Sequence, residues 1–171
     1  MTNKEFFMQT WQAEMKRTLS AVNGLPEDMS KLDYKCNDKA RSASDLIGHM
    51  LPHAEALSNA TKTFVASEGP SKQFNSREEA AQYFEKNATQ LLENLKDIDE
   101  KTWNDQVVAF EVNGNKLFEY PMSAMFWMFM FDIIHHRGQL STYYRSMGVR
   151  NPSIYGPTAE DMEEMMAAAS N

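Results

Sequence analysis

The sequence predicts an all-α protein, a bundle of four long helices. Four long segments carry apolar side chains at helical spacing, and the connections between them are short or moderate. The segment from Met122 to Ile134 is apolar on nearly every side, which is typical of a helix in the centre of a bundle or under a second subunit. A chain of 171 residues can bury one sizeable core, so we expect a single domain over residues 1–171.

Residues 4–22 predict the first helix. Asn23 and Gly24, with Pro26 shortly after them, indicate its end, and the next twenty residues are polar and irregular. Lys, Glu and Gln side chains lie opposite its apolar face. That face consists of Phe7, Trp11, Met15, Leu19 and Val22.

The second helix begins at a cap supplied by Ser42 or Ser44, and we expect it to end near residues 69–70. Pro52 lies inside this helix. Because proline lacks the N–H that would bond to the carbonyl of Gly48, we expect a local bend there.

A capping-box pattern at residues 76–79 opens the third helix. Its apolar stripe is Phe84, Ala88, Leu91, Leu95 and Ile98. Residues 106–118 then change to an alternating pattern, and Asn113-Gly114 is a strong hairpin turn signal. We therefore expect a short hairpin or irregular extended piece before the fourth helix, and no sheet.

The fourth helix begins with Pro121 in its first turn and is predicted to run to about Met147, where Gly148 caps it. A short final helix begins after Thr158. The methionines of the fourth helix are expected to lie in the core.

Composition excludes several classes of function. The formal net charge is −7 and the chain has no Lys/Arg cluster, so we expect no nucleic-acid partner. The most apolar stretch is too short to span a bilayer, and the polar N-terminus does not resemble a signal peptide. The single Cys36 excludes an internal disulfide and a Cys-rich zinc site. These features predict a cytoplasmic protein without a membrane partner.

The candidate site lies in the fourth helix. Asp132 and His136 are four residues apart and therefore share one helix face. The other histidines are His135 and, on the apolar stripe of the second helix, His49 and His53. A carboxylate at the end of an apolar stretch must be neutralised.

A divalent metal is one way to neutralise Asp132. If the two helix faces meet, two imidazoles and one carboxylate form a site suited to Zn, Ni or Fe(II). The alternative is an ion pair of Asp132 with Arg137 or Arg145, or imidazoles that donate to backbone carbonyls. Arg137 lies about 100° from the ligand stripe, so we assign Arg137 and Gln139 to orienting or structural roles.

Four segments of the chain resemble the DinB-like (DinB/YfiT) superfamily. They are residues 136–140 (HRGQL), 144–149 (YRSMGV), 152–157 (PSIYGP) and 48–50 (GHM). The helix order, with its strand-like interruption before the fourth helix, is also similar. The resemblance implies an up-down-down-up four-helix bundle that is often a homodimer.

The resemblance also implies a divalent metal (Zn, Ni, Fe or Mn) held by one His on the second helix and two on the fourth. His49 and His136 match two of these ligands, and Asp132 stands where the family more usually has His. This departure leaves two readings: a two-His-one-carboxylate site, or a lost site. His53 and His135 are neighbouring alternatives that would ligate the metal or orient a ligand.

The activity implied by the resemblance is that of a metal-dependent thiol transferase or hydrolase, with a metal-activated thiol or water as the nucleophile. A low-molecular-weight thiol or another small molecule would be the substrate. Other relatives are known only as DNA-damage-inducible or stress-associated proteins. The alternative is therefore a non-catalytic, metal-free dimeric bundle of that stress-associated kind.

Overall fold

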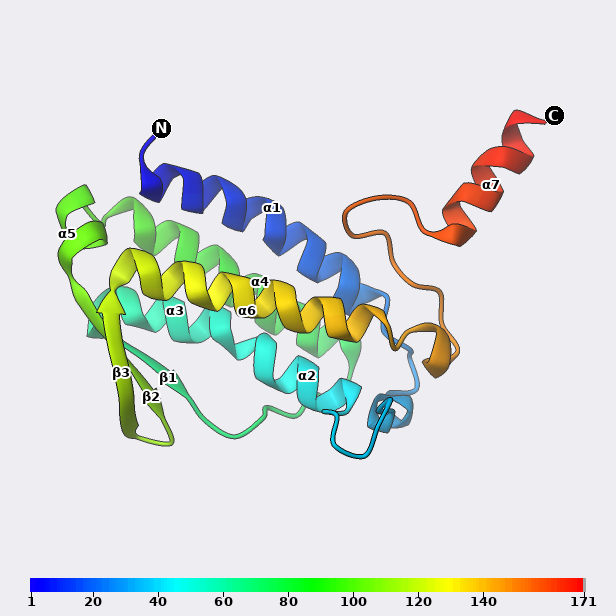
Figure 1. Cartoon of the computed structure of the whole chain (residues 1–171), viewed down its shortest axis with the longest axis horizontal. Helices are drawn as coiled ribbons and strands as arrows, with labels where there is room; N and C mark the ends of the chain where they lie inside the picture. The colour runs from blue at the N-terminus through cyan, green and yellow to red at the C-terminus, as the bar shows by residue number, and fades with distance from the viewer. Residues whose placement is uncertain (171) are drawn as a thin grey trace.

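The computed structural model describes residues 1–170 and is mostly helical (Figure 1). The elements in order are α1 (Asn3–Asn23), the 3₁₀ turn η1 (Met29–Asp33), α2 (Ala43–Met50), α3 (Pro52–Thr63), β1 (Val65–Glu68), α4 (Arg77–Lys96), α5 (Glu100–Asp105), β2 (Val107–Val112), β3 (Asn115–Pro121), α6 (Met122–Ser141), the 3₁₀ turn η2 (Arg145–Met147) and α7 (Ala159–Ala169).

Four long helical segments, α1, α2–α3, α4 and α6, pack around one core. In Figure 1, α1 and α6 run in one direction, and α2–α3 and α4 run in the other. Two hydrogen bonds are consistent with the antiparallel arrangement of α1 and α4. Arg77 at the start of α4 donates to the carbonyl of Leu25, just beyond the end of α1. Lys4 near the start of α1 donates to the carbonyl of Leu95 near the end of α4.

The expectation of an all-α fold is wrong, because a three-stranded sheet in the order β1-β2-β3 lies beside the helices. β2 and β3 form the hairpin expected around Asn113-Gly114, whose φ angles are 51° and 78°. The unexpected strand is β1, which pairs in parallel with β2. Phe64 ends α3 in the left-handed conformation, so the second helical segment stops at Thr63 and does not reach residues 69–70.

Other helix ends also differ from the sequence prediction. Pro52 opens a new helix, α3, directly after Leu51, so the expected bend is a boundary between α2 and α3. α6 ends at Ser141, not near Met147. The turn after it reaches Gly148, which has a φ of 78° and caps η2. The short helix α5 was not predicted.

The core is rich in aromatic side chains. Phe7 contacts Trp11, Trp103 and Phe126, all buried. Of the methionines of α6 that were expected in the core, Met122, Met125 and Met130 are buried and Met128 is half-buried. α7 projects away from the packed helices (Figure 1), and none of its residues is buried. None of the helices in residues 1–170 is long and apolar enough to cross a membrane.

Candidate metal centre

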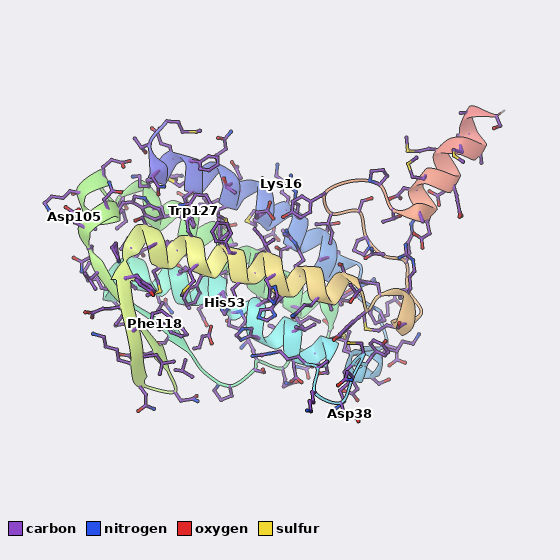
Figure 2. The ribbon with its side chains drawn as sticks, viewed as in Figure 1. Lys16, Asp38, His53, Asp105, Phe118 and Trp127 are labelled. Carbon is purple, nitrogen blue, oxygen red and sulfur yellow. The ribbon has the colours of Figure 1, made fainter. Side chains whose placement is uncertain are left out.

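Three helices bring the candidate ligands together. His49 is in the last turn of α2, and His53 is in the first turn of α3. Asp132 and His136 stand one turn apart on α6, on the face that meets α2 and α3. Figure 2 shows His53 in the middle of the molecule, between α6 and the α2–α3 segment. The two histidine-bearing helix faces therefore meet, which is the condition for a shared site.

The imidazoles converge on one carboxylate oxygen. Oδ2 of Asp132 lies 2.7 Å from Nε2 of His53 and 3.3 Å from Nε2 of both His49 and His136. The ring of His49 packs edge-on against those of His53 and His136, with centroids 4.8 and 4.6 Å apart. One carboxylate is therefore shared by three rings.

This sharing sets the charges of the site. Burial opposes ionisation of Asp132, but hydrogen bonds from His136, His49 and His53 outweigh it and hold the pKa of its carboxyl far below the ordinary value. The hydrogen bond to Asp132 raises the pKa of His136, against burial and against the positive charge of Arg41. Without a metal, the carboxylate of Asp132 thus favours the protonated form of His136.

Gln139 orients His136. Its Oε1 atom lies 2.8 Å from Nδ1 of His136, and its Nε2 atom lies 3.0 Å from Nε2 of His135. An Nδ1–H that is held by an acceptor leaves Nε2 free to face Asp132. The orienting role expected for Gln139 agrees with this contact.

Arg137 points away from the site. Its guanidinium is buried against α1, where it donates to Glu14 Oε2 at 2.5 Å and to Thr18 Oγ1 at 3.0 Å. Arg145 is paired with Glu160 at 2.8 Å. The alternative ion pair of Asp132 with either arginine is therefore wrong.

The sequence did not indicate Glu68, which lies at the end of β1 behind the two imidazoles of α2–α3. Its carboxylate is 3.5 Å from Nδ1 of His53 and 3.9 Å from Nδ1 of His49. Within residues 1–170, Nδ1 of His53 is buried without a hydrogen-bond partner, and the carboxylate of Glu68 lies 3.5 Å from it. The only sequence signal was an acidic residue directly before Gly69-Pro70.

Gly48 holds the chain that follows β1 against α2. The amide of Lys72 donates to the carbonyl of Gly48 at 2.9 Å. A Cβ at position 48 would lie 2.3 Å from the carbonyl oxygen of Lys72, which is a severe backbone clash. A residue without a side chain is therefore required directly before His49.

The donor set fits a divalent ion. In a tetrahedral site with bonds of about 2.0–2.2 Å, two ligand atoms lie roughly 3.3–3.6 Å apart. The 3.3 Å separations of Asp132 from His49 and from His136 match this spacing. The 2.7 Å contact of His53 with Asp132 is too short for two ligands of one ion and is a hydrogen bond.

A cavity of about 450 Å³ opens beside these groups, and we call it the metal-side cavity. Its polar lining residues are His49, His53, Glu68, Asp132 and His135. The rest of its wall is apolar and consists of Phe110, Met128, Phe129 and Phe131. A small molecule can therefore reach the imidazoles from a largely apolar space.

Two further residues lie at the edge of the site. Among the described residues, two groups of side chains converge closely enough to hold a metal ion: His49, Asp132 and His136, and His49, His53 and Glu68. His135 is exposed and belongs to neither group. Cys36 is exposed as a residue, and its Sγ lies 3.4 Å from the hydroxyl of Tyr143. Tyr143 is buried beside the loop that carries Cys36, and it does not line the metal-side cavity.

Comparison with known proteins identifies relatives over nearly the whole chain. A sequence model described as "DinB family" matches residues 1–168. The chain is 23% identical over 164 residues to the uncharacterized protein YrdA of Bacillus subtilis (strain 168), covering 92% of this chain and 90% of that protein.

Two crystal structures share the fold. A DinB-like protein from Bacillus cereus ATCC 10987 has a TM-score of 0.68 at 20% identity and covers 88% of this chain and 97% of its own. The DinB-like protein YjoA from Bacillus subtilis has a TM-score of 0.64 at 20% identity, with 89% and 99% covered.

Proposed function

Because this chain belongs to the DinB family, we propose that it is a divalent-metal-dependent enzyme whose ion is held by His49, Asp132 and His136. The observation that carries the proposal is the convergence of two imidazoles and one carboxylate, with ligand-like spacing, at a cavity of about 450 Å³. The cavity is large enough for a small substrate, and three protein ligands leave open positions on the ion.

A bound Zn, Ni, Fe or Mn ion would lower the pKa of a coordinated water or thiol and so provide a nucleophile near neutral pH. The protein's residues prepare this step. Gln139 holds His136 in the orientation that presents Nε2, and His53 fixes the carboxylate of Asp132 by its 2.7 Å hydrogen bond. The aromatic wall of the metal-side cavity, which includes Phe110 and Phe129, would provide an apolar surface for a substrate beside the reacting groups.

Two reaction classes suit this site. With a low-molecular-weight thiol as the nucleophile, the reaction is an S-transfer to an electrophilic small molecule. With water as the nucleophile, it is a hydrolysis. Both fit a cytoplasmic enzyme, which is the location we propose.

Elemental analysis of protein purified without a His tag or added metal tests the proposal. We expect near-stoichiometric metal in the wild type and loss of that metal in His49→Ala. The matched control is His135→Ala, which removes an exposed imidazole near the site and leaves the metal content unchanged. Equal metal content in His49→Ala and the wild type would rule out His49 as a ligand.

One observation favours a second candidate function. The charge of Asp132 is compensated by three imidazoles without any metal, so the same cluster is able to serve stability alone. The protein would then be a metal-free, stress-associated interaction protein. A wild type that takes up no Zn, Ni, Fe or Mn after incubation with each ion would favour this function. About one ion per chain in the purified protein would exclude it.

We also propose a homodimer, for which the exposed aromatic side chains along α6 provide support. Phe131 is 59% exposed although it follows a long apolar run, and Trp127, one turn earlier, contacts the exposed Phe6 of α1. Contiguous aromatic surface of this kind is typical of protein interfaces.

A further inference from the structure

A second cavity lies beside the metal centre, between the loop that precedes α2 and the last turns of α6. Its volume is about 690 Å³, and we call it the basic cavity. Lys39 and Arg41 line it from the loop, and His135, Gln139 and Tyr143 line it from α6 and the turn that follows. No Asp or Glu is among the described residues that line it, although acidic residues outnumber basic ones by 24 to 17 in the chain.

Arg41 differs from the other arginines. The five others all have a carboxylate partner: Arg17, Arg77, Arg137, Arg145 and Arg150. Within residues 1–170, the guanidinium of Arg41 has no carboxylate within ion-pair distance. Its fork of N–H donors is therefore available at the rim of a cavity without acidic groups.

Contacts of the buried Tyr143 hold the loop in place at this rim. The hydroxyl of Tyr143 donates to the backbone carbonyl of Arg41 at 3.2 Å and lies 3.4 Å from Sγ of Cys36. The ring of Tyr143 packs edge-on against Tyr34, with centroids 5.1 Å apart. The backbone of Arg41 is thus anchored to a buried side chain, and its exposed side chain extends from that fixed point at the rim.

The basic cavity is connected to the metal centre. His135 lines both cavities, and Gln139 on the wall of the basic cavity bonds to the ring of His136. A small molecule that extends past His135 from one cavity into the other is therefore able to place one end at Arg41 and the other end at the proposed metal.

We propose that the basic cavity binds an oxyanion group of the substrate, a carboxylate or a phosphate, through Arg41 with Lys39 as a second cation. The planar guanidinium matches two oxygens of such a group, and the lysine adds a point charge. This inference rests on the proposed enzymatic function and adds a substrate class to it: an acidic small molecule whose reactive end faces His49, Asp132 and His136.

NMR titration of the purified, full-length protein with malonate tests this proposal, with neutral malonamide as the matched probe. We expect malonate to shift the amide signals of residues 36–41 and malonamide to leave them in place. In Arg41→Gln, the malonate Kd should rise about tenfold or more, as for loss of a charge-assisted hydrogen-bonded contact. Arg41→Lys keeps the positive charge but not the forked N–H donors of the guanidinium, so its malonate Kd should lie between those of the wild type and Arg41→Gln.

Two further variants show whether a change in the malonate Kd comes from the basic cavity, from the overall charge of the protein or from the proposed metal site. Lys16→Gln removes one positive charge from the exposed face of α1, far from the loop that carries Asp38 (Figure 2), and should leave the malonate Kd unchanged. His49→Ala removes a proposed metal ligand and should also leave it within a factor of about two. No titration by malonate in the wild type, or an equal Kd in Arg41→Gln and the wild type, would overturn the proposal.

The same variants distinguish failure of this inference from failure of the proposed function. Malonate binding that is lost in His49→Ala and kept in Arg41→Gln would mean that malonate binds the metal, which supports the metal and overturns the anion site. Binding that depends on Arg41 in a protein without metal would leave the anion site standing and remove the proposed enzymatic role of the ion.

Discussion

Nε2 of His53 lies 2.7 Å from Oδ2 of Asp132. The Nε2 atoms of His49 and His136, which we propose as metal ligands together with Asp132, are both farther from this oxygen, at 3.3 Å. His53 is 1% exposed, whereas the carboxylate it contacts reaches the metal-side cavity. The buried ring thus acts as a fixed support, and the carboxylate is the group that faces a ligand. Both histidines of the α2–α3 segment line that cavity, but His53 makes the short hydrogen bond to Asp132, whereas His49 lies at the longer, ligand-like distance.

The first prediction concerns the pH dependence of the metal-free protein. The lowered pKa of Asp132 stabilises the fold above the ordinary carboxyl value of 3.8, and this contribution is lost as the pH falls. The raised pKa of His136 stabilises the fold below the ordinary imidazole value of 6.5, and this contribution is lost as the pH rises through the raised value. We expect the free energy of unfolding of chelator-treated protein to be largest between these two values.

Urea denaturation at a series of pH values measures this dependence. Asp132→Asn removes the carboxylate that causes both shifts, so its free energy of unfolding should vary less with pH on each side of the maximum. The same pH profile in Asp132→Asn and the wild type would show that other groups determine it.

The second prediction concerns Glu68. Its carboxylate faces Nδ1 of both His49 and His53, at 3.9 and 3.5 Å, and a carboxylate behind a ligating imidazole raises the basicity of that ligand. Glu68→Gln should therefore weaken metal affinity by about 10–100-fold without preventing folding. Competition with a chelator of known affinity measures the change. Glu111→Gln on the adjacent strand β2 is the control and should leave the affinity unchanged.

The sequence indicated the candidate ligands on helices, but it did not indicate Glu68, whose carboxylate faces two of the imidazoles. Spacing of four residues places Asp132 with His136 on one face of a helix, and this is local information. Glu68 reaches the site only because β1 pairs with β2, with Glu68 opposite Val112, more than forty residues away. The segment before it, Val65-Ala66-Ser67, is too short to show an alternating pattern, and a helix was expected to continue through it.

The ends of the helices were less predictable for a related reason. Phe64 adopts a left-handed conformation that a large aromatic residue seldom takes, so nothing local indicated the end of α3. After Ser141, α6 gives way to a turn in which the buried Tyr143 and Tyr144 are both held by contacts with distant segments. Tertiary contacts fix both endings, and a sequence pattern does not report them.

The third prediction concerns the ion pair between α1 and α6. Arg137 is 1% exposed and bonds to Glu14 at 2.5 Å, so loss of the carboxylate leaves a buried, unpaired charge. Glu14→Ala should lower the free energy of unfolding by about 3–5 kcal/mol. Because Arg137 points away from the metal centre, metal content per folded chain should not change. Glu85→Ala on the exposed face of α4 is the control and should cost much less. A small loss of stability in Glu14→Ala would mean that Thr18 and Tyr155 suffice to hold the guanidinium.

The fourth prediction concerns assembly. The rings of Phe6, Trp127 and Phe131 form a continuous aromatic surface across α1 and α6, with centroid separations of 5.5 and 5.6 Å. Phe131 also lines the metal-side cavity, so a second copy on this surface would narrow the entrance to the site. Light scattering after size-exclusion chromatography should give the mass of a dimer for the wild type and of a monomer for Phe131→Glu, because a charge at the centre of an apolar interface is costly to bury. Met166→Glu, an equally exposed apolar position on α7, should remain a dimer. A monomeric wild type would contradict the homodimer, and a dimeric Phe131→Glu would place the interface elsewhere.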